Sequence, residues 1–100
     1  MITQDQVKEA LKVVTDPEIG INIVDLGLIY DVDITDEGEA LVRYSLTSMG
    51  CPAGEMIDTE IRDVVASMEG VTSVTTEVTF QPPWTVEKMS DFAKSALGFF

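Results

Sequence analysis

The stretch TSMGCPAGEM, residues 47–56, contains the only cysteine of the chain, Cys51, between Gly50 and Pro52. Proline is favoured at the first position of a helix, so Cys51 is expected at or next to a helix N-cap. Unpaired backbone N–H groups and the helix dipole lower the pKa of a cysteine there and prepare its thiolate for reaction or metal ligation. A free cysteine also serves as a small buried apolar residue. Position alone therefore leaves both a reactive and an inert Cys51 open.

Carboxylates gather in two short motifs ahead of the first expected strand. Asp16 and Glu18 flank Pro17 in the motif DPE, and Asp25 lies in the motif VDLG. Asp before Pro initiates turns, and Gly27 supplies an unusual backbone angle, so turn formation explains both motifs without a function. From spacing alone we favour this turn interpretation.

The residues of the common catalytic motifs are missing. The chain has no histidine, no CxxC pair, no glycine-rich phosphate loop and no serine–histidine arrangement. Most enzyme classes that are recognised by their motifs therefore have no support in this sequence.

The charge of the chain is strongly negative. Eighteen acidic residues against six basic ones give a net charge of -12, which repels phosphate backbones and anionic membranes. We therefore expect neither nucleic acid nor a membrane as a partner, and we interpret the acids as a solvated surface. One cysteine forms no internal disulfide, and no stretch approaches the ~18 apolar residues of a membrane span. These features predict a cytoplasmic protein.

Hydrophobic periodicity predicts a helix and a β-hairpin in the first half of the chain. Thr3 and Gln6 form a capping box, and the apolar residues that follow share one helical face as far as Val14. A turn at residues 36–38 joins two alternating segments, which should pair as antiparallel strands. The inward side chains of the first strand are expected to be Leu28, Tyr30, Val32 and Ile34.

The second half predicts a helix, a strand and a last helix. The first of these helices follows Cys51 and ends by Gly70, the strand covers residues 74–80, and Thr85 caps the last helix. Strands two and three, joined by a helix, should be parallel. The order α-β-β-α-β-α predicts an α/β fold of the α+β type. It is a two-layer sandwich with a small three-stranded mixed sheet and helices on one face, in a single domain over residues 1–100. The order of the strands in the sheet does not follow from the sequence.

Three ordered segments carry a family resemblance: DPEIGINIVDLGLIYDV, SLTSMGCPAGEMI and VTFQPPWTVEKMSDFAKSALG. Together they resemble the SufT/PaaD-like (MIP18-type) family of iron-sulfur cluster assembly proteins, which is related to the eukaryotic cytosolic iron-sulfur targeting subunit. The PPWT ending is most similar to the small stand-alone prokaryotic members. The resemblance covers nearly the whole chain and implies an assembly or delivery factor rather than a typical enzyme.

The resemblance also implies a site around the cysteine. Carried over residue by residue, it consists of Asp16 and Glu18 of the DPE motif, Thr47 and Ser48, and Cys51 as the metal ligand. Ser48 stands where relatives commonly have Thr, and it retains the hydroxyl.

Ligand number limits what one cysteine can hold. Iron-sulfur clusters usually take four protein ligands, so an iron-sulfur cluster on this chain should be transient or shared. Two subunits of a homodimer could each donate Cys51, or a client could supply the other ligands. The expected partners are client apoproteins and other iron-sulfur assembly proteins. Two alternatives stay open: a thiol redox or nucleophilic protein that uses Cys51, and a pure protein-interaction module.

Overall fold

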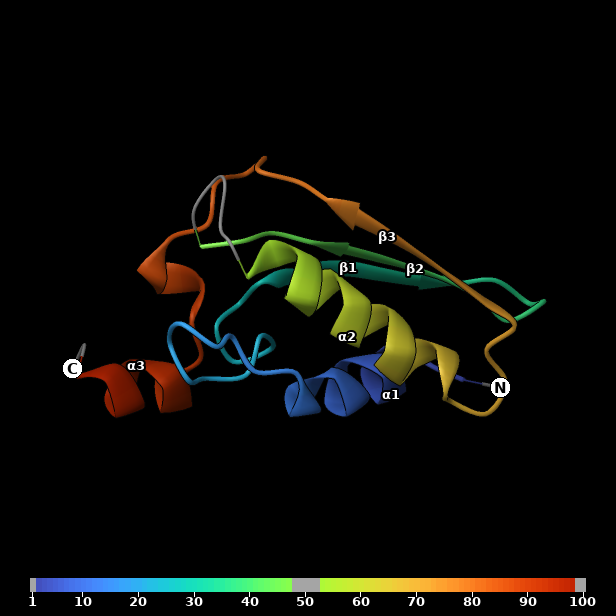
Figure 1. Ribbon diagram of the computed structural model, residues 1–100, viewed down its shortest axis with the longest axis horizontal. Coiled ribbons are helices and arrows are strands. Elements are labelled where there is room, and N and C mark those ends of the chain that lie inside the picture. The colour runs from blue at the N-terminus through green and yellow to red at the C-terminus, as the bar shows by residue number, and fades with distance from the viewer. Residues whose placement is uncertain (1, 48–52, 99–100) are drawn as a thin grey trace.

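The structure is a computed structural model that describes residues 2–47 and 53–98 of the chain. It has two layers, a three-stranded sheet and a layer of helices (Figure 1). The elements in chain order are α1 (Gln4–Ala10), the 3₁₀ helix η1 (Leu11–Val13), β1 (Ile29–Ile34), β2 (Glu39–Tyr44), α2 (Gly54–Ala66), β3 (Ser73–Val78), the 3₁₀ helix η2 (Val86–Lys88) and α3 (Asp91–Leu97). This arrangement confirms the predicted α+β fold.

The strands follow the order β1-β2-β3, with β1 antiparallel to β2 and β2 parallel to β3. The parallel pairing of β2 and β3, which are joined through α2, confirms the predicted parallel pair. Because β1 runs opposite to both β2 and β3, it begins at the end of the sheet where those two strands finish. There the N–H of Ser45 donates to the carbonyl of Leu28 (2.8 Å), and the N–H of Thr79 donates to the carbonyl of Tyr44 (2.8 Å). We call this the Tyr44 end of the sheet.

The core lies between the sheet and the helices α1 and α2, which cover one face of it, as predicted (Figure 1). The other face is polar: Arg43 forms ion pairs with Asp31 (3.0 Å) and Glu77 (3.3 Å), and these raise the pKa of the guanidinium. No helix in the described ranges is long and apolar enough to cross a membrane. The core includes Val7 on α1, Leu11 on η1, Ile57, Ile61 and Val65 on α2, and Val32, Val42 and Tyr44 in the sheet.

The first helix begins at the predicted capping box, but its α-helical part ends at Ala10, earlier than the predicted end near Val14. The hydroxyl of Thr3 accepts the N–H of Gln6 (3.1 Å), and the N–H of Thr3 donates to the side-chain carbonyl of Gln6 (2.8 Å). This is a complete capping box. The last turn tightens into η1, and the chain is extended at Val14.

A β-bulge changes the direction of one side chain in β1. Ile29 pairs with Tyr44 but Asp31 pairs with Arg43, so Tyr30 is an extra residue in the ladder. The prediction that Tyr30 faces the core was wrong, because a bulge shifts the alternation of side chains by one residue.

The helix α2 begins two residues later than predicted. Its N-cap is Ala53, and its first hydrogen bond runs from the N–H of Ile57 to the carbonyl of Ala53 (2.9 Å). Cys51 and Pro52, where the sequence predicted the start of this helix, lie outside the described part of the chain.

The last predicted helix is divided at Met89, which is extended between η2 and α3. Ser90 caps α3, because its hydroxyl accepts the N–H of Ala93 (3.2 Å). Thr85, the predicted cap, precedes η2 and makes no side-chain cap hydrogen bond there. A second N-cap within the segment thus overrides the apolar periodicity that had predicted one helix.

Candidate functional site

Three of the five predicted site residues lie in the described part of the chain. They are Asp16, Glu18 and Thr47, whereas Ser48 and Cys51 lie outside it. The segment with the DPE motif leads into β1, and the segment that reaches Thr47 leaves β2. Both therefore meet the sheet at its Tyr44 end.

The DPE turn, residues 16–18, is a tight reversal that buries a carboxylate. Thr15 pairs with Asn22 in an isolated antiparallel bridge, which closes the loop around the turn. The side chain of Asp16 is only 1% exposed, and its Oδ1 accepts the N–H of Glu18 (2.9 Å). Asp16 therefore forms a turn, in agreement with the turn interpretation of the DPE motif given above.

The second half of this loop is tied to the C-terminal segment. The side-chain amide of Asn22 donates to Oδ2 of Asp25 (2.6 Å), and the N–H of Ser90 donates to the carbonyl of Asp25 (2.7 Å). The hydrogen bond from Asn22 holds the pKa of Asp25 below its ordinary value, with Ser90 contributing and partial burial opposing. The indole N–H of Trp84 donates to the carbonyl of Leu26 (2.6 Å). The loop is thus fixed against residues 84–90.

Gly27 is required by a close approach of two backbone segments. Its φ is +78°, and a Cβ at this position would lie 2.6 Å from the carbonyl carbon of Lys88 and closer still to the oxygen. The structure confirms the unusual backbone angle that the VDLG motif predicted, and it adds a steric reason for glycine.

The two sides of the cysteine segment come together at the start of α2. Leu46 and Gly54 line one hollow of about 490 Å³, and a Cβ on Gly54 would lie 3.1 Å from Leu46 Cδ1. Leu46, just after β2, and Gly54, at the start of α2, therefore lie close together on either side of the cysteine segment.

A partly buried hydrogen-bond network holds α2 on the sheet in the same region. Asp58 accepts hydrogen bonds from the hydroxyls of Tyr44 (2.8 Å) and Thr76 (2.6 Å), and from Nε of Arg62 (2.8 Å). Burial opposes ionisation of Asp58, but these three donors hold its pKa below the ordinary value. Burial and the nearby carboxylate raise the pKa of Tyr44. One carboxylate thus joins α2 to both β2 and β3.

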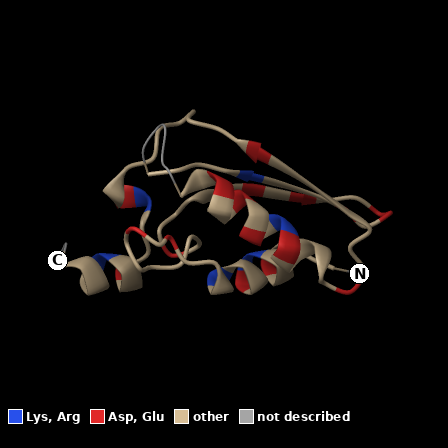
Figure 2. Cartoon of the chain, in the orientation of Figure 1, with Lys and Arg blue, Asp and Glu red and all other residues tan. Residues whose placement is uncertain are grey.

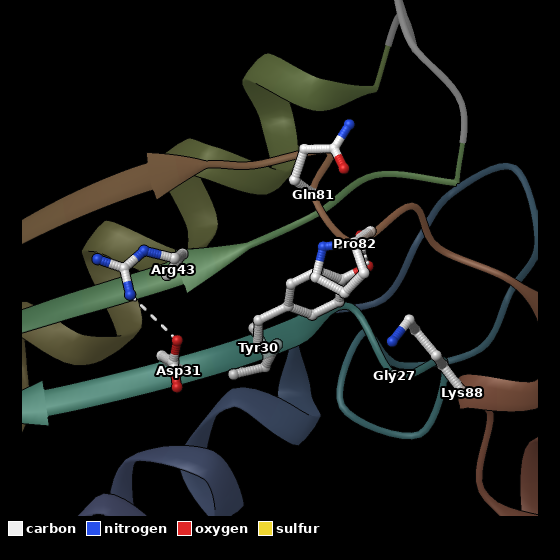
Figure 3. A pocket seen from close by; sticks show the side chains of 8 residues that line it. Gly27, Tyr30, Asp31, Arg43, Gln81, Pro82 and Lys88 are labelled. Atoms are coloured by element: carbon white, nitrogen blue, oxygen red, sulfur yellow. Dashed lines mark hydrogen bonds and ion pairs between the residues drawn. The ribbon is translucent and has the colours of Figure 1, made fainter.

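A hollow of about 470 Å³ that the sequence did not predict lies on the polar face of the sheet (Figure 3). The hydroxyl of Tyr30 donates to the carbonyl of Pro82 (2.9 Å), and Lys88 Nζ lies 5.0 Å from the centre of the Tyr30 ring. Arg43 and Asp31 pair at its other side. Tyr30, the bulged residue, lines this hollow, and no pattern in the sequence marks it.

Acidic residues are spread over α1, α2 and the sheet (Figure 2). Among residues 2–47 and 53–98, no three His, Cys, Asp or Glu side chains gather as a metal site.

Known structures share this fold. A crystal structure titled "Domain of Unknown Function DUF59 from Bacillus anthracis" is similar with a TM-score of 0.92 and 36% sequence identity. The similarity covers 97% of this chain and 92% of that one. The chain is therefore a domain of this α+β type.

Sequence comparisons give the family. A family model described as "Iron-sulfur cluster assembly protein" matches residues 4–76. The "Fe-S protein maturation auxiliary factor YitW" of Bacillus subtilis (strain 168) is 42% identical over 95 residues, 95% of this chain and 93% of the relative. The "Fe-S protein maturation auxiliary factor SufT" of Staphylococcus aureus (strain USA300) is 46% identical over 85 residues, 85% of this chain and 97% of the relative. The chain belongs to the iron-sulfur cluster assembly protein family, which confirms the resemblance.

Proposed function

We propose that this protein is an Fe-S protein maturation auxiliary factor that binds iron or an iron-sulfur cluster transiently and delivers it to client apoproteins. One observation carries the proposal: the family match spans residues 4–76 and so contains both the DPE turn and the cysteine segment. Two relatives that are 42% and 46% identical bear the name of maturation auxiliary factors.

Cys51 is the metal ligand in this proposal. It is the only thiol of the chain, and iron-sulfur clusters are held mainly by thiolates. Asp16, Glu18, Thr47 and Ser48 supply oxygen ligands or orient the metal beside the thiolate. This assignment is supported by the topology, since the segments with the DPE turn and with Thr47 adjoin the same end of the sheet.

The cargo is held briefly because one chain offers too few ligands. A cluster usually needs four, and one thiolate with a few carboxylates does not complete that set. The remaining ligands come from a second subunit, a client or another assembly protein. A reducing cytoplasm suits this chemistry, because it keeps the single thiol of the chain reduced.

Activation of a client tests the proposal. The purified protein is loaded anaerobically with iron and sulfide and mixed with an apo-[4Fe–4S] dehydratase, whose activity returns with its cluster. We expect Cys51→Ser to abolish activation and Asp16→Asn to slow it, while Asp5→Asn, the same charge change on the exposed first turn of α1, leaves it unchanged. If Cys51→Ser activates the dehydratase at the wild-type rate, the ligand role of Cys51 is wrong.

A further inference from the structure

An apolar groove of about 400 Å³ lies beside the DPE turn. We call it the Trp84 groove. The loop before β1 forms one side of it, and η2, its flanking residues and α3 form the other. Glu18 is its one charged lining residue, and the others are Ile19, Leu26, Trp84, Val86, Met89 and Leu97.

The groove offers apolar surface that the described chain leaves uncovered. Leu26 and Met89 are buried at its base, whereas the side chains of Val86 and Leu97 are 41% and 37% exposed. Of the α3 residues that the structure describes, only Ala93 is buried. Exposed apolar surface that adjoins a charged residue is characteristic of protein interaction sites.

Hydrogen bonds keep the walls of the groove in place without a ligand. Trp84 is held to the carbonyl of Leu26, and the cap residue of α3, Ser90, is held to the carbonyl of Asp25. A docking segment therefore meets a formed surface and loses little free energy in ordering it.

Charge selects the kind of partner. The chain carries a net charge of -12, and the only charged residue that lines the groove is acidic. Nucleic acid and anionic lipid carry negative charge and are repelled from this groove, whereas a basic segment is attracted to it.

We propose that the Trp84 groove docks a short segment of a client apoprotein that places apolar side chains next to Lys or Arg. The proposal rests on the proposed function, because it assigns the groove to the clients of the neighbouring site. The apolar side chains contact Trp84, Val86 and Leu97, while the basic residue lies near the acidic DPE turn.

Fluorescence of the only tryptophan, Trp84, tests the proposal without metal. Two Trp-free octapeptides share two Leu and one Phe and differ in three flanking residues, which are Lys in one and Glu in the other. The Lys peptide should change Trp84 emission saturably and bind roughly tenfold more tightly than the Glu peptide, with an affinity that falls as salt rises.

Variants locate the binding surface. Val86→Lys should lower the affinity for the Lys peptide by roughly tenfold. Leu97→Ser, a different chemical change, should lower it by a similar factor. Val13→Lys is the matched control, since Val13 is 71% exposed and does not line the groove. Thermal unfolding verifies that each variant is folded.

Equal binding of the two peptides, no saturable signal, or equal affinity in Val86→Lys and Val13→Lys would overturn the proposal. Cys51→Ser should bind the Lys peptide as the wild type does. The docking proposal and the metal-ligand proposal can therefore fail independently of each other.

Discussion

The substitution Gly27→Ala probes the contact that fixes the loop of the DPE turn against the C-terminal segment. A methyl group at this position would overlap the backbone carbonyl of Lys88. Neither backbone can yield by a change of side-chain rotamer. The segment around Lys88 must therefore move away from the loop, and the hydrogen bond between Trp84 and Leu26 weakens with it.

Two costs add at Gly27. Alanine with φ of +78° costs about 1–2 kcal/mol in backbone energy, and the steric overlap adds about 1–3 kcal/mol, as overpacking does elsewhere. Gly20→Ala measures the backbone cost alone. Its φ is +83°, and a Cβ there would have no heavy atom within 4 Å, so no steric overlap is added. Gly20→Ala should therefore cost about 1–2 kcal/mol, whereas Gly27→Ala should cost about 2–5 kcal/mol.

Urea unfolding followed by circular dichroism measures the free energy of unfolding of each variant. The emission of Trp84 in the folded state reports whether the C-terminal segment has moved. We expect a shift in native emission for Gly27→Ala and none for Gly20→Ala. Equal destabilisation by the two substitutions, with unchanged emission, would show that the close approach to Lys88 does not restrain this loop.

Two further substitutions test the polar contacts. Asp58→Asn should lower the free energy of unfolding at pH 7 by about 1–2 kcal/mol, because the charge-assisted bond from Arg62 is lost. Folding lowers the pKa of Asp58. The stability that its carboxylate contributes is therefore fully present above the unfolded-state pKa of about 3.9, and it is lost as the pH falls through the folded-state pKa. The wild type and Asp58→Asn should thus converge in urea unfolding below about pH 4, and a constant difference down to pH 2 would contradict this. Ser90→Ala should cost about 1 kcal/mol and Ser90→Thr less, and equal melting temperatures for the wild type and Ser90→Ala would contradict the cap assignment.

Local features of this fold follow from short stretches of sequence. The capping box at Thr3 and Gln6 depends on hydrogen bonds within four residues, and the hairpin on alternation around one turn. The DPE turn likewise involves a side chain and a backbone N–H two residues apart. Each of these can be predicted because the partners are neighbours in the chain.

Features that depend on partners far apart in the chain could not be predicted from the sequence. The bulge at Tyr30 interrupts an alternation that looks unbroken in sequence, and the break at Met89 depends on the cap at Ser90, which also donates to Asp25. The Trp84 groove combines residues 18–26 with residues 84–97. These segments come together only in the packed structure. The strand order likewise depends on packing between segments that are distant in the chain.

Iron stoichiometry after anaerobic reconstitution tests the central claim most directly. Iron, sulfide and protein mass are measured on the same gel-filtration peak, with absorption spectroscopy to identify the cluster, for the wild type and Cys51→Ser. A cluster shared through Cys51 predicts a wild-type dimer with about one cluster per two chains, and no cluster on Cys51→Ser of unchanged melting temperature. A wild-type monomer with a complete cluster, or a Cys51→Ser variant that loads equally, would contradict the account.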